Sequence, residues 1–112
     1  MMNLQELSQG AVTVLKPSGP LILGEAEAFR DRALVLAEQT LGRIVIDASA
    51  VTYVDSCGLE ILLELTEQMQ QGGRALKLCA TNPTVTEALK LTMLMEMFDY
   101  FDDVNQAVRS FL

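Results

Sequence analysis

The sequence predicts an α/β fold, with one mixed β-sheet of four to five strands packed with about four helices and residues 1–112 forming a single domain. Short β-branched runs alternate with longer stretches of helical periodicity, the order expected of a sheet covered by helices. The run Ile44-Val45-Ile46 is apolar without alternation, which is typical of a strand buried on both faces. A length of 112 residues, of which 50% are hydrophobic, suits one domain with its own core.

The N-terminal half predicts two strands, a turn and a helix. Residues 11–15 are β-branched and predict a strand, and residues 4–8 predict a weaker edge strand whose hairpin-like pairing makes the sheet mixed. Residues 17–20, written PSGP, predict a turn or loop. Gly42 is placed to end the helix that follows. The apolar positions of this predicted helix recur at helical spacing: Ala26, Phe29, Ala33 and Leu36.

The C-terminal half continues the alternation. Residues 43–47 predict the central strand, residues 59–71 a second helix closed by Gly72-Gly73, and residues 75–80 another strand. Asn82-Pro83-Thr84 opens a third helix, in which Thr84 and Glu87 have the spacing of a capping box. A short last helix begins at Asp102 and Asp103. Its predicted buried stripe is Val104, Ala107, Val108 and Phe111.

The charge balance excludes some classes of partner. The chain has 15 acidic and 8 basic residues, a formal charge of −7, and its Lys and Arg do not cluster. We therefore expect binding neither to nucleic acid nor to an anionic lipid surface. The apolar runs are too short to cross a bilayer, so no membrane insertion is expected. The first residues have no basic and apolar signal pattern, and two cysteines without such a signal favour a reduced, cytoplasmic protein.

The junction Val54-Asp55-Ser56-Cys57-Gly58-Leu59 is the first candidate site. With Ser56 at the start of the second helix, a rotation of about 100° per residue places four polar side chains within an arc of roughly 80°. These are Ser56, Glu60, Glu64 and Glu67, whereas Leu59, Leu62, Leu63 and Thr66 fall on the apolar side, which Ile61 and Leu65 widen. Ser56 is thus expected at the head of a solvent-facing acidic line.

The start of a helix also suits a phosphate group. Backbone N–H groups in the first turn have no intrahelical partner, and the helix dipole adds partial positive charge there. Gly58 removes a side chain where an anion or another protein's backbone could approach. A phosphoserine at Ser56 would add charge without breaking the helix. Asp and Ser are equally the preferred helix N-cap residues, so an ordinary cap explains the pair Asp55-Ser56 as well.

A longer pattern extends this site. The strand Ile44-Val45-Ile46-Asp47, the spacer of residues 48–54 and the run Asp55-Ser56-Cys57-Gly58-Leu59 together resemble the signature of STAS domains, a family named for sulfate transporters and anti-sigma factor antagonists. The resemblance covers nearly the whole chain and implies a STAS-like fold.

The resemblance to the bacterial antagonist branch implies a partner switch. Such a protein binds an anti-sigma factor that is a serine kinase, is phosphorylated on the serine after the Asp, here Ser56, and is then released. A serine phosphatase reverses the modification. The resemblance carries Asp55, Ser56, Gly58 and Leu59 over directly. The expected partner-binding residues are Asp55, Ser56, Cys57, Gly58, Leu59, Glu60, Glu64 and Glu67.

Two positions depart from the pattern of this family. Many relatives have Ser or Thr where Cys57 stands. Relatives often read Gly-x-Leu-Asp before the first helix, whereas this chain reads Gly19-Pro20-Leu21-Ile22 and lacks that carboxylate.

Other classes of function remain as alternatives. One is a STAS scaffold or accessory subunit, lipid-transport or stressosome-like, that binds partners without phosphorylation. Another is a small-ligand or nucleotide-binding module. The chain has no histidine, which excludes Ser–His and Cys–His catalysis and the usual zinc sites, so we expect neither an enzyme nor a cofactor or metal. Cys57 is interpreted as a small filler rather than a redox sensor, and the cluster of Met93, Met95 and Met97 as mostly core.

Overall fold

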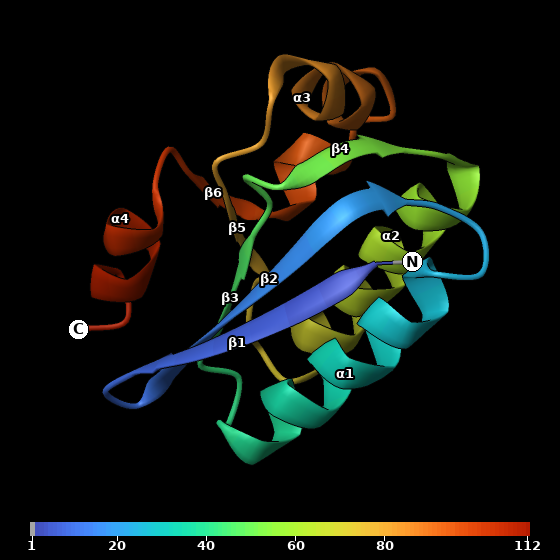
Figure 1. Ribbon diagram of the computed structural model, residues 1–112. Coiled ribbons are helices and arrows are strands. Elements are labelled where there is room, and N and C mark those ends of the chain that lie inside the picture. The colour runs from blue at the N-terminus through green and yellow to red at the C-terminus, as the bar shows by residue number, and fades with distance from the viewer. Residues whose placement is uncertain (1) are drawn as a thin grey trace.

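The computed structural model describes residues 2–112 and confirms the α/β class with a mixed sheet (Figure 1). Within these residues there are six strands instead of the predicted four to five, together with four α-helices and one 3₁₀ helix. In chain order the elements are β1 (Asn3–Gln9), β2 (Val12–Leu21), α1 (Ala26–Gln39), β3 (Ile44–Asp47), β4 (Val51–Val54), α2 (Ser56–Gln71), β5 (Lys77–Cys79), α3 (Pro83–Leu91), η1 (Leu94–Met97), β6 (Asp99–Phe101) and α4 (Val104–Arg109).

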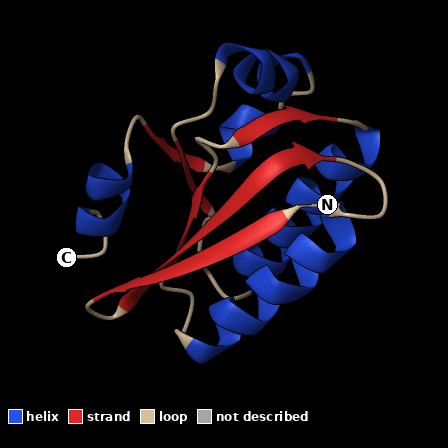
Figure 2. Ribbon diagram, viewed as in Figure 1, coloured by secondary structure: helices blue, strands red, loops and turns tan. Residues whose placement is uncertain are grey.

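The sheet has the strand order β1-β2-β3-β5-β6, and β4 pairs with β2 away from this path. The hairpin of β1 and β2 is antiparallel, whereas the other pairings are parallel. Helices α1 and α2 cover one face of the sheet, α4 lies on the opposite face, and α3 packs beside β4 (Figures 1 and 2). The edge position predicted for the first strand is confirmed.

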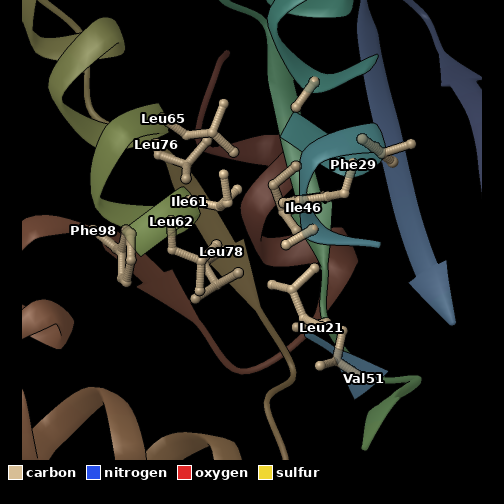
Figure 3. Packing of buried hydrophobic residues seen from close by; sticks show 14 of the residues in the cluster. Leu21, Phe29, Ile46, Val51, Ile61, Leu62, Leu65, Leu76, Leu78 and Phe98 are labelled. Atoms are coloured by element: carbon tan, nitrogen blue, oxygen red, sulfur yellow. The ribbon is translucent and has the colours of Figure 1, made fainter. Parts of the chain in front are cut away.

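The main core lies between the sheet and the pair α1 and α2, as the close view in Figure 3 shows. All four residues of β3 are buried, which confirms the predicted central strand. The four apolar positions predicted for α1 are also all buried. A second, smaller cluster joins Val14 and Val45 to Ala107 of α4, with Val104, Val108 and Phe111 packed around it. The apolar stripe predicted for the last helix is therefore confirmed.

The predicted turn at residues 17–20 is wrong, because these residues belong to β2. This strand pairs with β3 through Thr13 to Leu15 and then with β4 at Gly19 and Leu21. The pairing register shifts between Gly19 and Leu21, and Gly19 has a φ of 105°. An irregular strand of this kind tolerates proline because some ladder positions are left without a hydrogen bond.

Two short strands were not predicted from the sequence, and a third strand is shorter than predicted. The run Val51–Val54 forms β4 and residues Asp99–Phe101 form β6. The strand predicted over residues 75–80 is limited to Lys77–Cys79, after which Ala80 takes a left-handed φ of 63°.

The methionine cluster follows its predicted role in part. Met95 and Met97 are half-buried against the main core, while Met93 is exposed.

The helix ends correct one prediction, confirm a second and confirm a third in part. The capping box of Thr84 and Glu87 is wrong: Asn82 is the N-cap of α3, where its Oδ1 accepts from the amide of Val85 at 2.8 Å. Helix α1 ends at Gln39, and both Leu41 and Gly42 take left-handed φ values, of 56° and 85°. The amide of Gly42 donates to the carbonyl of Ala37 at 2.7 Å and closes the helix as predicted, although Leu41 is the first left-handed residue. Asp103 caps α4 as predicted, accepting from the amide of Gln106 at 2.8 Å.

Asn82 also fastens α3 to β4. Its Nδ2 donates to the carbonyl oxygens of Val51 and Thr52, at 3.0 and 3.1 Å. Because β4 pairs with the main sheet only through β2, these bonds hold the outer side of the strand that leads directly to Ser56.

We expect Asn82→Ala to lower the free energy of unfolding by about 2 kcal/mol, because it removes both the helix cap and the two bonds to β4. Asn82→Ser keeps a capping oxygen and loses only the tether, so it should cost about 1 kcal/mol. Urea denaturation followed by circular dichroism measures both values. Equal stability of the two variants would contradict the division of roles.

Candidate functional site

The side chain of Asp55 fixes the start of α2. Its Oδ1 accepts a hydrogen bond from the amide of Gly58 at 2.8 Å, which is the N-cap bond predicted for this residue type. Its Oδ2 accepts from the amide of Leu23 at 3.0 Å, in the loop between β2 and α1. The bonds from Gly58 and Leu23 both stabilise the ionised carboxylate and hold the pKa of Asp55 below its ordinary value.

The loop between β2 and α1 is fastened by main-chain bonds as well. The carbonyl oxygen of Ile22 accepts from the amides of Glu25 and Ala26, at 3.0 and 2.9 Å, and the amide of Asp55 donates to the carbonyl of Leu21 at 3.3 Å. The side chain of Ile22, at the position where many relatives have a carboxylate, is half-buried. The loop and the start of α2 therefore form one rigid unit.

Gly58 has a different role from the one predicted. It is buried, and a Cβ at this position would lie 2.2 Å from the carbonyl oxygen of Leu21. The close approach that requires glycine is therefore made by the protein's own backbone, not by an anion or a partner. Gly58 lets α2 begin directly against the end of β2.

The structure places Ser56 as the first residue of α2, with its side chain exposed. Glu60 and Glu67 are exposed on the same helix, as expected for the acidic line. Glu64 departs from the expectation: it is half-buried and pairs with Arg30 of α1 at 3.1 Å. The acidic line is thus interrupted by one ion pair.

The buried stripe of α2 is rotated slightly from the one predicted. Ile61, Leu62 and Leu65 point into the core (Figure 3), together with Thr66 and Met69. Leu59 and Leu63 are only half-buried at its border.

A groove of about 340 Å³ runs between α1 and α2 beside this site. Its lining includes Leu23 and Cys57, four carboxylates and the guanidinium of Arg30. The carboxylates belong to Glu27, Glu60, Glu64 and Glu67.

The two cysteines are free and differ in their surroundings. Cys57 is half-buried beside the groove, whereas burial in the sheet raises the pKa of the Cys79 thiol to about 12. Cys79 is therefore an unreactive core residue.

Within residues 2–112 no group of three or more His, Cys, Asp or Glu side chains is arranged to hold a metal ion. In the same part of the chain, no helix combines the length and the apolar character needed to cross a membrane.

The comparisons with known proteins place this fold and site in a family. The family model described as STAS domain matches residues 4–107, and the chain belongs to this family.

The chain is also similar to a relative found by its sequence and to solved structures. A protein of Bordetella bronchiseptica named as an anti-sigma factor antagonist, BtrV, is 26% identical over 92 residues, which cover 80% of this chain and 79% of the relative. A crystal structure of a protein from Thermotoga maritima, also titled as an anti-sigma factor antagonist, has a TM-score of 0.86 at 20% identity and covers 96% of this chain and 92% of that one. The anti-sigma factor antagonist SpoIIAA in its unphosphorylated form has a TM-score of 0.75 at 17% identity, with 96% and 94% covered.

Sequence reasoning missed two residues at this site. Leu23 lies in a loop without periodicity, although its position directly before Gly24 marks a turn in which Gly24 has a φ of 89°. Arg30 has no distinguishing signal in the sequence, because its pairing with Glu64 depends on how the two helices cross.

We expect Gly58→Ala to lower the free energy of unfolding by about 1–3 kcal/mol, because the added methyl group overlaps the carbonyl of Leu21. Gly72→Ala is the matched control, since its Cβ would meet nothing closer than 3.5 Å. Urea denaturation of both variants gives the comparison. A Gly58→Ala protein as stable as the control would show that the contact is not needed.

The capping bonds also predict a dependence on pH. Because the pKa of Asp55 is lower in the folded state, its contribution to stability is complete above the ordinary value of 3.8 and is lost as the pH falls through the folded value. The measurement is the free energy of unfolding at a series of acidic pH values. Asp55→Asn should remove this part of the dependence, with the exposed Asp102→Asn as control. An unchanged pH profile in Asp55→Asn would contradict the assignment.

Proposed function

We propose that this protein is an anti-sigma factor antagonist that binds an anti-sigma factor with serine kinase activity and is released when Ser56 is phosphorylated. The observation that carries the proposal is the placement of Ser56: its side chain is exposed at the first residue of α2, on a backbone held by Asp55. The STAS match over residues 4–107 and the similarity to proteins named as anti-sigma factor antagonists support it.

The residues around Ser56 divide into two groups under this proposal. Asp55 and Gly58 hold the start of α2 through the contacts described above. Cys57, Glu60 and Glu67 provide the accessible surface that a partner contacts, while Leu59 lies at the border of the core. Glu64 belongs to neither group, because its half-buried side chain pairs with Arg30 of α1.

The protein would be the substrate of the modification and not its catalyst. The Oγ of Ser56 attacks the γ-phosphorus of the partner's ATP, the bond to the β-phosphate oxygen breaks, and the hydroxyl proton leaves to a base of the kinase. A serine phosphatase hydrolyses the phosphoserine and restores the hydroxyl. The site and its partners are proposed to be cytoplasmic.

Phosphorylation would act on the complex and leave the fold intact. The phosphate adds between one and two negative charges at the N-terminus of α2, where the helix dipole favours an anion. In the complex it replaces a hydroxyl that touches the partner. Loss of one interfacial hydrogen bond to a charged group costs about 1.5–3 kcal/mol, which corresponds to about a ten- to a hundredfold loss of affinity.

The test uses this protein and a purified anti-sigma factor with serine kinase activity from the same organism. We expect mass spectrometry after incubation with ATP to locate phosphate on Ser56. Ser56→Ala should bind the kinase like the unmodified wild type, and Ser56→Asp should bind about tenfold more weakly.

Modification at another residue, or equal affinities of Ser56→Ala and Ser56→Asp, would contradict the switch. A stable complex that an active kinase never modifies would instead indicate a scaffold.

A further inference from the structure

Leu23 is an exposed apolar side chain next to the proposed phosphorylation site. It is 70% exposed, although its backbone lies in the rigid unit formed by the loop and the start of α2. One carboxylate, that of Asp55, bonds the amide of Leu23 and the amide of Gly58 in the first turn of α2. The exposed leucine is therefore held in a defined position relative to Ser56.

A fixed loop binds a partner at lower cost than a mobile one. Ordering a loop on association consumes part of the interaction free energy, and this loop is already ordered by the bonds to the Ile22 carbonyl and the Asp55 carboxylate. The buried centre of a protein interface is more apolar than its polar rim, so an exposed leucine held in this way suits a central position in an interface.

The rim beside Leu23 is acidic. The groove that Leu23 lines carries four carboxylates and one guanidinium, a formal charge of −3. Arg30 is already bonded to Glu64 and Asp31, and among the described residues Glu27, Glu60 and Glu67 have no ion-pair partner. The matching surface on a partner is therefore one that places Lys or Arg side chains around an apolar pocket.

We infer that Leu23 is the apolar anchor of the interface with the anti-sigma factor, and that the partner receives it in an apolar pocket flanked by basic residues that face the groove. This inference rests on the proposed function. It adds to the α2 surface a residue of the loop between β2 and α1, and it makes that loop a determinant of partner choice.

The test measures binding of the same purified anti-sigma kinase, without ATP, by isothermal titration calorimetry. Leu23→Ala keeps the backbone amide that bonds Asp55 and removes only exposed apolar surface. We expect it to weaken the complex by about tenfold, while Leu23→Met stays within about twofold of the wild type. The matched control is Leu91→Ala, which removes the same group from a side chain that is 75% exposed at the end of α3.

A second set of variants, Glu60→Gln and Glu67→Gln, tests whether the carboxylates of the groove contribute to binding. Each should weaken binding at low ionic strength and reduce its dependence on salt, whereas the exposed Glu96→Gln in η1 should leave both unchanged. Thermal unfolding of every variant checks that the fold is intact.

The outcomes separate the two proposals. If wild type binds the kinase and Leu23→Ala binds equally tightly, the anchor is wrong while the proposed function stands. An equal loss of affinity in Leu23→Ala and Leu91→Ala would also overturn the anchor. If wild type does not bind the kinase, the proposed function itself is overturned.

Discussion

The carboxylate of Asp55 is the interaction on which the site depends. One oxygen caps α2 and the other holds the loop that precedes α1, so a single side chain joins segments 32 positions apart in the chain. The absence of a side chain at Gly58 lets α2 begin in close contact with the Leu21 carbonyl at the end of β2. Ser56 is exposed, yet its backbone lies between the capping residue Asp55 and the closely packed Gly58.

The parts of the fold that could be predicted are those with a strong local pattern. The uninterrupted apolar run of β3 and the helical spacing of Phe29, Ala33 and Leu36 report burial directly. The strands β4 and β6 are short, and their pairing depends on partners far away in the chain. The PSGP stretch carries a turn signal, which the change of strand partner along β2 overrides.

The candidate site shows the same division. The exposure of Ser56 and the Asp55 cap followed from the periodicity and capping chemistry of a single helix. The surroundings of Glu64 and Gly58 could not be predicted from the pattern of one helix, because each depends on another element. Glu64 pairs with Arg30 of α1, and Gly58 packs against the end of β2. The exposure of Leu23 likewise depends on a loop whose shape is fixed by Asp55.

The loop before α1 has one more consequence, which concerns evolution. Its conformation is maintained by amide and carbonyl groups and by Asp55, so the outward side chain at position 23 contributes nothing to keeping it in place. Such a position can be exchanged without loss of folding. Duplicated genes for this domain could then diverge at one surface residue and acquire different partners within a single cell, while Ser56 and its backbone stayed the same.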